Sequence, residues 1–440
     1  MSENRLEVLQ YADRRSAHSQ SVDLRIGKKA VVTPNFCLRV KSEQELDLFL
    51  NLKAKYPLSF VSSYVVRLLD APRTLYPKIK NLAQTGLFGE IAKTPYVSSL
   101  DSDLIFIDLG LEYLYYHSEN VLQRITSSFI IPRIFRDYAK KCLSEKKRMT
   151  SSYEFLKWRD AFHRKFWNTL YEDDSQRTKM IRDSHNLEIK FRADILIPPT
   201  PLITSDRLLD MTILINERSR ELARGKRESA DYFLLRVDAL RDNDIMDKIK
   251  QCVESSEDTR LTIFKFKNMN LNSEERTSEK KAFKDLLIEL SYITRHSENK
   301  AFMLLDAANQ VFPAALTGFN IVSASFNGDK EDRHMRIERS PYGSWYDPDY
   351  MVFRTRKQLL EEIIKNNGGV IPCHCPECTS PSGLLSEDCI EYNRAVKRHY
   401  LFARETEMKE IFEAIKKKTT SMGADKLQRS SLKNLIDLIP

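Results

Sequence analysis

Short apolar runs alternate with longer amphipathic stretches along most of the chain. The apolar runs predict β-strands at residues 30–33, 59–65, 104–108, 193–197, 261–266, 301–306 and 320–325. Between them, the spacing of apolar residues predicts helices, among them residues 42–55 and 205–224. In the second helix Ser205 can cap the start and Gly225 can end it. Strands that alternate with helices indicate parallel βα units.

Parallel βα units form either an open doubly wound sheet or an eight-stranded barrel. No GxGxxG or GxxxxGK[ST] motif follows a predicted strand, which removes the usual evidence for a nucleotide-binding open sheet. Polar residues stand at or near the ends of three predicted strands, at Asp108, Asp306 and Ser323. In a barrel these strand ends are where the chemistry takes place. We therefore expect an α/β fold with a (β/α)8 TIM barrel over residues 1–365.

A basic and aromatic stretch interrupts this rhythm and predicts a helical insertion at about residues 144–190. It contains the aromatic residues Phe155, Trp158, Phe162, Phe166 and Trp167, with Lys157, Arg159, Arg164 and Lys165 between them. One interpretation is that the aromatic side chains pack on the barrel. The other is a nucleic-acid contact, because aromatic rings interleaved with cations suit the stacking of single-stranded bases.

Composition limits the classes of function. The chain has 440 residues and a net charge of +8, which fits a polyanionic partner without requiring one. No stretch approaches the roughly 18 continuous apolar residues of a membrane span. The charged N-terminus has no apolar segment behind it, unlike a secretory signal. We expect a soluble, cytoplasmic protein with no membrane partner.

Four of the seven cysteines lie close together near the C-terminus. Cys373, Cys375 and Cys378 form a C-x-C-x-x-C loop that can direct three thiolates at one centre, and His399 is the natural fourth ligand. Cys389 is an alternative to His399 as the fourth ligand. A further alternative is that the cysteines are reduced and bind no metal. His374 lies inside the loop and would point away from the thiolates. The pattern predicts a structural Zn²⁺ site in a subdomain over residues 366–440.

The segment from Cys373 to residue 415 resembles the tRNA-guanine transglycosylase family. That family has C-x-C-x-x-C followed some twenty residues later by a histidine that opens a helix, and His399, on the predicted helical run after Tyr392, stands at the matching place here. Where the family has asparagine after this histidine, the chain has Tyr400. The resemblance implies a (β/α)8 barrel with a zinc subdomain inserted near its end. The resemblance covers roughly the last 120 residues well. Over the barrel it extends only to the alternation of strands and helices.

The resemblance also implies catalytic positions, with departures from the family motifs. The family's D-S-G-G-F-Q motif matches here at Asp108 and Gly110 only. Asp194 resembles the acid of a mid-barrel strand and would bind substrate. Ser323 stands where the family has its nucleophilic aspartate, and Asp306, at the end of the preceding strand, can replace it. Asp306 can instead cap the following helix.

The activity that the resemblance implies is the exchange of guanine in a nucleic acid for a 7-deazaguanine. The divergence of the chain favours DNA as the substrate over tRNA. The alternative is a catalytically silent barrel that binds nucleic acid or a partner transglycosylase subunit, and the resemblance also implies a homodimer. Phosphates would be bound by basic residues near the zinc site, namely Arg394, Lys397, Arg398 and Arg404.

Overall fold

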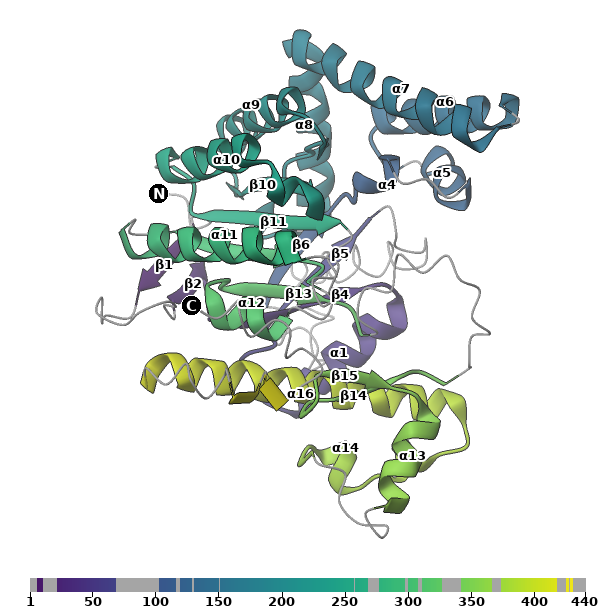
Figure 1. Cartoon of the computed structure of the whole chain (residues 1–440), viewed down its shortest axis with the longest axis vertical. Coiled ribbons are helices and arrows are strands. Elements are labelled where there is room, and N and C mark those ends of the chain that lie inside the picture. The colour runs from purple at the N-terminus through teal and green to yellow at the C-terminus, as the bar shows by residue number, and fades with distance from the viewer. Residues whose placement is uncertain are drawn as a thin grey trace, which may run out of the picture.

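The chain forms a parallel sheet of ten strand segments covered by helices (Figure 1). The structure is a computed structural model that describes residues 6–10, 22–68, 103–115, 119–128, 130–149, 151–256, 258–267, 277–296, 300–307, 311–326, 342–365, 373–417, 425–426 and 428–429. Of the helices in these ranges, none is long and apolar enough to cross a membrane.

The ten strand segments are all paired in parallel. In spatial order they are β8 (Leu202–Ile203), β10 (Asp231–Arg236), β11 (Leu261–Lys267), β12 (Ala301–Leu305), β13 (Ile321–Ala324), β4 (Asn35–Val40), β5 (Ser63–Arg67), β6 (Leu104–Asp108), β7 (Ile195–Leu196) and β9 (Glu228–Ser229). β13, the last of these strands in the chain, pairs with β4, the first. The sheet therefore curls on itself as at least half of a barrel.

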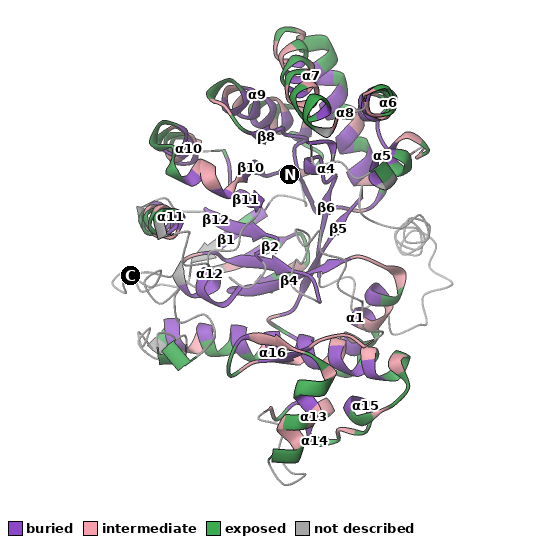
Figure 2. Cartoon of the chain, turned by 45° about the vertical axis from the view of Figure 1, so that its right-hand side comes forward, coloured by how far each residue is buried: buried purple, intermediate pink, exposed green. Residues whose placement is uncertain are grey.

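Alternate residues of the strands face opposite sides of the curled sheet, as the twofold period of a strand requires. One apolar cluster gathers the residues of the inner face, among them Cys37, Val65, Phe106, Ile263 and Met303. The intervening residues belong to a second cluster that includes the covering helices. Both faces are apolar because both are buried, which is the pattern expected of parallel sheets (Figure 2).

A small antiparallel sheet covers the amino end of the interior. It consists of β1 (Leu6–Gln10), β2 (Val22–Ile26) and β3 (Lys29–Val32). Leu6, Leu24 and Val31 from these strands belong to the inner-face cluster. The Leu6 carbonyl accepts a hydrogen bond from Arg260, which precedes β11. The predicted strand at residues 30–33 therefore exists, but it belongs to this sheet and not to the parallel one.

Helices α1 (Glu43–Lys55), α9 (Asp206–Ala223), α10 (Asn243–Ser255), α11 (Thr277–His296) and α12 (Val311–Thr317) lie between strands of the sheet in chain order. The predicted helix starts and stops match two of them. The Ser42 hydroxyl accepts a hydrogen bond from the Glu45 backbone N at 3.2 Å and so caps α1. Gly225 has φ +80° just after α9, a conformation that glycine adopts without strain. Ser205 precedes α9 without a side-chain capping bond.

A run of helices between β6 and β7 projects beyond the sheet (Figure 1). It comprises α4 (Glu112–Tyr115), α5 (Glu119–Thr126), α6 (Arg133–Arg148), α7 (Ser152–Glu172) and α8 (Asp174–Lys190). Helical structure therefore begins at Glu112, well before the expected residue 144. Trp158 stacks on Phe162 with ring centroids 4.9 Å apart, and Trp167 is fully buried. Phe155 and Trp167 are buried, and the half-buried Trp158, Phe162 and Phe166 pack against the core. This packing favours the first interpretation of the aromatic residues over the base-stacking surface.

The C-terminal part packs around the long helix α16 (Cys389–Lys417). It also contains β14 (Trp345–Asp347), β15 (Val352–Arg354), α13 (Arg356–Lys365), α14 (Pro376–Thr379) and α15 (Ser382–Leu385). Trp345 and Leu359 share an apolar cluster with Cys375 and Cys378, so packing joins residues before 366 to the metal-binding loop. The Glu405 carboxylate accepts hydrogen bonds from the backbone N of Ser59 and Phe60 and fixes α16 to the sheet.

Four strand segments of the parallel sheet are missing from the sequence prediction: β4, β8, β9 and β10. β8 and β9 have only two residues each. The two longer strands have a charged residue within or at the end of the apolar run, Arg39 in β4 and Arg236 in β10. Such charges are typical of exposed segments, and this hid the strands. The other predicted strands overlap β5, β6, β7, β11, β12 and β13.

Candidate active site and metal centre

A layer of charged side chains lies above the apolar interior, toward the carboxyl ends of the strands. On four strands a charged residue follows two positions after an inner-face residue: Arg39 after Cys37, Arg67 after Val65, Asp108 after Phe106, and Lys265 after Ile263. Because every second residue of a strand shares a face, the four charged side chains point into the same interior.

Lys265 brings three carboxylates together at this layer. Its Nζ lies 2.8 Å from Asp108 Oδ2, 2.5 Å from Glu112 Oε1 and 3.2 Å from Asp306 Oδ2. All four side chains are buried. The structure thus places Asp108 and Asp306, both expected from the sequence, around one ammonium group.

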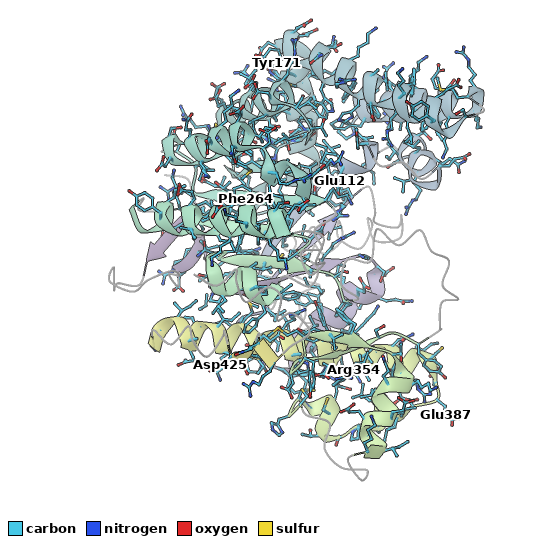
Figure 3. All side chains as sticks on the ribbon, viewed as in Figure 1. Glu112, Tyr171, Phe264, Arg354, Glu387 and Asp425 are labelled. Atoms are coloured by element: carbon cyan, nitrogen blue, oxygen red, sulfur yellow. The ribbon has the colours of Figure 1, made fainter. Side chains whose placement is uncertain are left out.

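Two arginines complete the cluster, which we call the charge layer: Arg39, Arg67, Asp108, Glu112, Lys265 and Asp306. Arg39 Nη1 lies 3.1 Å from Asp306 Oδ1, and Arg67 Nη1 lies 3.2 Å from Glu112 Oε1. Arg67 also pairs with Asp306. Three cations therefore balance three anions. Figure 3 labels Glu112 where the projecting helices meet the sheet.

Burial and charge act in opposite directions on these pKa values. Burial alone would raise the pKa of Glu112, but Lys265 and Arg67 outweigh it and lower the pKa to about 2. Burial, helped by the nearby Arg67 charge, lowers the pKa of Lys265 below its ordinary value. The carboxylate of Glu112 is thus ionised at neutral pH because its cationic partners are present.

The backbone positions both expected acids. Asp306 follows β12 with φ +56°, a left-handed conformation that aspartate tolerates better than most residues. This turn directs its side chain to the charge layer, although Leu305 before it already faces the interior. Gly110 has φ +74°, and its N donates a hydrogen bond to Asp108 Oδ1 at 2.8 Å.

Ser323 lies in β13, next to the end of β12. It is fully buried, and its carbonyl oxygen accepts a hydrogen bond from the backbone N of Ala307 at 2.8 Å. Its hydroxyl has no hydrogen-bond partner among the residues that the structure describes. Ser323 therefore borders the position of Asp306.

Asp194 lies at the other end of the sheet. Its Oδ2 is 2.8 Å from Lys29 Nζ and accepts a hydrogen bond from the Ile105 backbone N at 2.8 Å. Ile105 and Asp108 are three residues apart in β6, or roughly 10 Å along the strand. Asp194, which precedes β7, thus links that strand to β3 and β6. It does not belong to the charge layer.

The sequence prediction missed Arg39, Arg67, Glu112 and Lys265. The signal that would have revealed three of them is their spacing of two from an apolar residue within a strand. Glu112 begins a short helix, and no periodicity marks it.

The metal-binding residues expected from the sequence lie together. One ligand atom from each of Cys373, Cys375, Cys378 and His399 falls within 4.8 Å of the other three. His399 Nδ1 is 3.3 Å from the Sγ atoms of both Cys375 and Cys378. Tetrahedral zinc, with Zn–S bonds of about 2.3 Å and Zn–N bonds of about 2.0 Å, would separate sulfur and nitrogen by about 3.6 Å. The four residues can hold a metal ion.

The other nitrogen of His399 is fixed by the backbone. Its Nε2 lies 2.6 Å from the carbonyl oxygen of Tyr346, which can only accept, so Nε2 carries a hydrogen and Nδ1 faces the thiols. Trp345 stacks on the imidazole with ring centroids 5.0 Å apart. His374 is exposed, and Cys389 is not part of the cluster. The first choice of four ligands thus agrees with the geometry.

Two thiols of the metal-binding cluster have pKa values shifted in opposite directions. Hydrogen bonds from Cys375 and Cys378 hold the pKa of Cys373 far below its ordinary value, and the hydrogen bonds that Cys378 makes to Cys373 and Cys375 raise its own pKa. Burial instead raises the pKa of both Cys37 and Cys142 to about 12. Such neutral, buried thiols are unreactive.

The basic residues expected to bind phosphates near the metal centre are mostly paired. Arg398 makes two hydrogen bonds to Glu377, at 2.6 and 2.9 Å. Arg404 is buried and pairs with Glu407 at 2.5 Å. These ion pairs stabilise the C-terminal part around α16 and leave few basic side chains there to bind a ligand.

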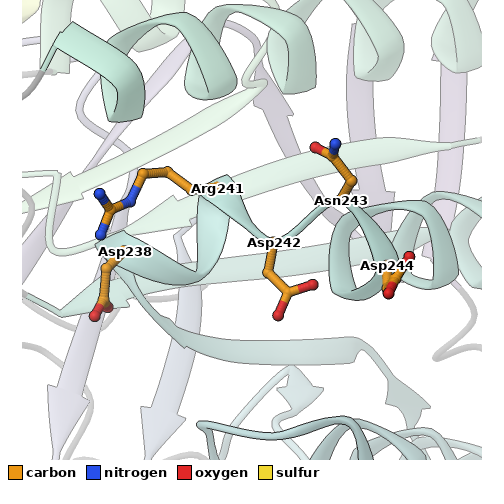
Figure 4. Close-up of a pocket in the computed structure, with 5 residues that line it drawn as sticks. All are labelled: Asp238, Arg241, Asp242, Asn243 and Asp244. Carbon is orange, nitrogen blue, oxygen red and sulfur yellow. The ribbon is translucent and has the colours of Figure 1, made fainter.

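An open hollow near the carboxyl end of β10 is a separate feature (Figure 4). It is lined by Asp238, Arg241, Asp242, Asn243 and Asp244, at the junction of η1 (Val237–Arg241) and α10. The Asp242 carboxylate caps α10 by accepting from the Ile245 backbone N at 3.2 Å. This cap gives Asp242 a structural role. The charge layer is therefore the stronger candidate for a catalytic site.

Removing one metal ligand should release the ion. We expect Cys378→Ser to reduce bound zinc from about one ion per chain to well below half and to lower the thermal unfolding midpoint. Elemental analysis and calorimetry measure both quantities. His374→Ala and Cys389→Ser are matched controls and should keep zinc, and loss of zinc in Cys389→Ser would contradict the ligand set.

Acid should weaken the fold through Glu112. Because its pKa is lowered from 4.5 to about 2, the unfolded chain binds the proton more readily. Stability is therefore present above pH 4.5 and is lost as pH falls toward 2, by about 3 kcal/mol in total. Urea unfolding between pH 5 and pH 3 should show a smaller loss for Glu112→Gln than for the wild type. Glu154→Gln, at an exposed position, should behave like the wild type.

Comparisons with known proteins leave the family of this chain open. No model of a known protein family matches it, and no curated protein matches it. The features of the chain that bear on function are the charge layer, the metal centre and the resemblance in the C-terminal segment.

Proposed function

We propose that the chain is an enzyme that exchanges guanine in a nucleic acid, DNA rather than tRNA, for a 7-deazaguanine base. The observation that carries this proposal is the meeting of Asp108 and Asp306 at Lys265, at the carboxyl ends of parallel strands. The resemblance to the transglycosylase family calls for two acids at this place. The proposal makes the chain a pentosyltransferase.

Closure of the sheet into a (β/α)8 barrel is part of the proposal. β9 is at one end of the strand order and β10 is next to the other end, yet Ala230 alone separates them in sequence. The Ala230 backbone N donates to the Leu196 carbonyl of β7 at 3.0 Å. Residues 228–236 are then one strand that pairs with β7 in its first half and with β8 in its second. If β7 and β8 are likewise counted as one strand, the ten segments make eight, which supports a ring of eight strands.

Zinc is the metal that we assign to the Cys373, Cys375, Cys378 and His399 cluster. Three thiolates and one imidazole form a closed structural set that leaves no position for a substrate. The ion would tie the loop before α14 to α16. The zinc ion would stabilise the fold, and the residues of the charge layer would catalyse the reaction.

In the proposed reaction a carboxylate oxygen of Asp306 forms a bond to ribose C1′ as the C1′–N9 bond to guanine breaks. An anionic nucleophile suits this step because departure of the base develops positive charge on the ribose. Asp108 relays a proton from the Lys265 ammonium to N9 of the leaving guanine and returns the N9 proton of the entering base to Lys265. N9 of the entering base then displaces the Asp306 carboxylate and restores it. Gly110 orients Asp108 by its hydrogen bond.

A second candidate is a catalytically silent barrel that binds nucleic acid or a partner subunit. Two observations favour it. Ser323 occupies the position expected for the nucleophile, and Arg39, Arg67 and Lys265 neutralise the acids that remain. A carboxylate held by three cations is a weaker nucleophile, so reaction requires the substrate to loosen these pairs.

A base-exchange assay separates the two candidates. Zinc-loaded protein is incubated with labelled 7-deazaguanine and either duplex DNA or tRNA. We expect label in DNA, and a loss of at least about 100-fold in rate for Asp306→Asn, because the amide cannot attack C1′. Asp258→Ala, at an exposed surface pair, is the control and should retain full activity.

Folding is checked in parallel by thermal unfolding, since loss of a buried charge partner costs about 3–5 kcal/mol. Label entering neither polymer with a folded wild-type protein would overturn the enzyme proposal and favour the silent barrel. Exchange that survives in folded Asp306→Asn would move the nucleophile to another residue.

A further inference from the structure

Helices α6 and α7 hold most of the chain's excess positive charge. Residues 133–165 contain eleven lysines and arginines and four acids, a surplus of seven, whereas the whole chain has a net charge of +8. The remainder of the chain is therefore almost neutral. Charge concentrated in this way on one pair of helices indicates a surface for an anionic partner.

These charges are displayed to solvent on the outer faces of the helices. On α7, Lys157, Arg164 and Lys165 are exposed and lie seven and eight residues apart, which puts them on one face. Lys147 is exposed near the end of α6. Lys147, Lys157 and Lys165 make no ion pair with any residue that the structure describes.

The inner face of the same helices is already occupied. Phe162 lies 4.9 Å from Tyr138 of α6 and stacks on Trp158, and Phe166 lies 4.9 Å from Tyr138. A helix that binds in the plane of a membrane needs a free apolar face to bury among lipid chains. Most apolar side chains of α7 face the protein instead, and only Tyr153 and Leu156, near its start, are exposed among its large apolar residues. The outer face is therefore mainly ionic and suits a hydrated polyanion.

The basic helices are attached directly to the charge layer. Glu112, a member of that layer, is the first residue of α4, and α4 contacts both α6 and α7. The Arg159 guanidinium of α7 lies 4.6 Å from the ring of Tyr115, which belongs to the interior cluster. Figure 1 shows α6 and α7 at the top of the view, with α4 and α5 between them and the sheet, and α13 and α16 at the bottom.

We call the exposed outer faces of α6 and α7 the arm. We propose that the arm binds the phosphate backbone of a nucleic acid and holds it at the carboxyl end of the curled sheet. The proposal deepens the function above, on which it rests for the base that reacts. Lysines on a rigid helix contact phosphates without reading sequence, so this surface supplies affinity and not choice of site.

The test measures the binding of a labelled 30-base-pair DNA duplex, a single strand and tRNA by fluorescence anisotropy at several salt concentrations. The arm variant carries Lys147→Glu, Lys157→Glu and Lys165→Glu. The control variant carries Lys357→Glu, Lys409→Glu and Lys416→Glu, with the same change in net charge on exposed positions of α13 and α16. Both variants are first shown to unfold at the wild-type temperature, and Lys→Gln versions replace any that do not.

We expect the arm variant to bind at least about tenfold more weakly near 100 mM salt. Its slope of log K against log salt should fall by about 2 to 3, since each lost phosphate contact removes about 0.9. The control variant should stay within about threefold of the wild type. Which of the three probes binds most tightly identifies the polymer.

Equal weakening of both variants would overturn the proposal, because net charge and not this surface would then govern binding. So would an unchanged salt slope in the arm variant, or binding of the arm to phosphatidylserine vesicles in place of nucleic acid. A folded wild-type protein that binds the probes through these helices but exchanges no base counts against the proposed function alone. Loss of the difference between the arm and control variants, with base exchange intact, counts against the binding surface alone.

Discussion

Lys265 is a buried ammonium group in the interior of a sheet, and most of the architecture around it follows from the need to neutralise it. A buried charge without partners costs several kcal/mol, so Asp108, Glu112 and Asp306 must all reach it. This requirement fixes the relative positions of β6, β11, the turn after β12 and the start of α4. Arg39 and Arg67 then balance the additional negative charges. One electrostatic balance thus joins elements far apart in the chain.

The sequence predicted the two strand-end acids of this layer, Asp108 and Asp306, but not its cations, for a physical reason. An acid at the end of an apolar run resembles a functional strand end, whereas a cation inside such a run resembles a surface position. Arg39 and Asp306 are 267 residues apart, so no local pattern connects them. The same effect hid β4. The order of strands and helices was visible because apolar periodicity is local, while the pairing that makes the interior neutral is not.

The metal centre was more predictable because its chemistry is largely contained in a short segment. Three cysteines within six residues and a histidine 21 residues after the last of them bring their own geometry. What the sequence did not reveal is the support around them. The Tyr346 carbonyl and the Trp345 ring, which orient His399, come from a strand some 50 residues earlier. The sequence also gave no sign that Glu405 attaches α16 to the sheet.

The small sheet of β1, β2 and β3 closes the amino end of the interior, where Leu6, Leu24 and Val31 fill the space between the strands. The charge layer lies toward the other end of the strands, so this cover leaves only the carboxyl side for an approaching molecule. In the proposed exchange, the leaving guanine and the entering base would therefore use the same side of the sheet. That geometry fits a ping-pong order, in which the first base departs before the second binds and the protein holds the ribose in between.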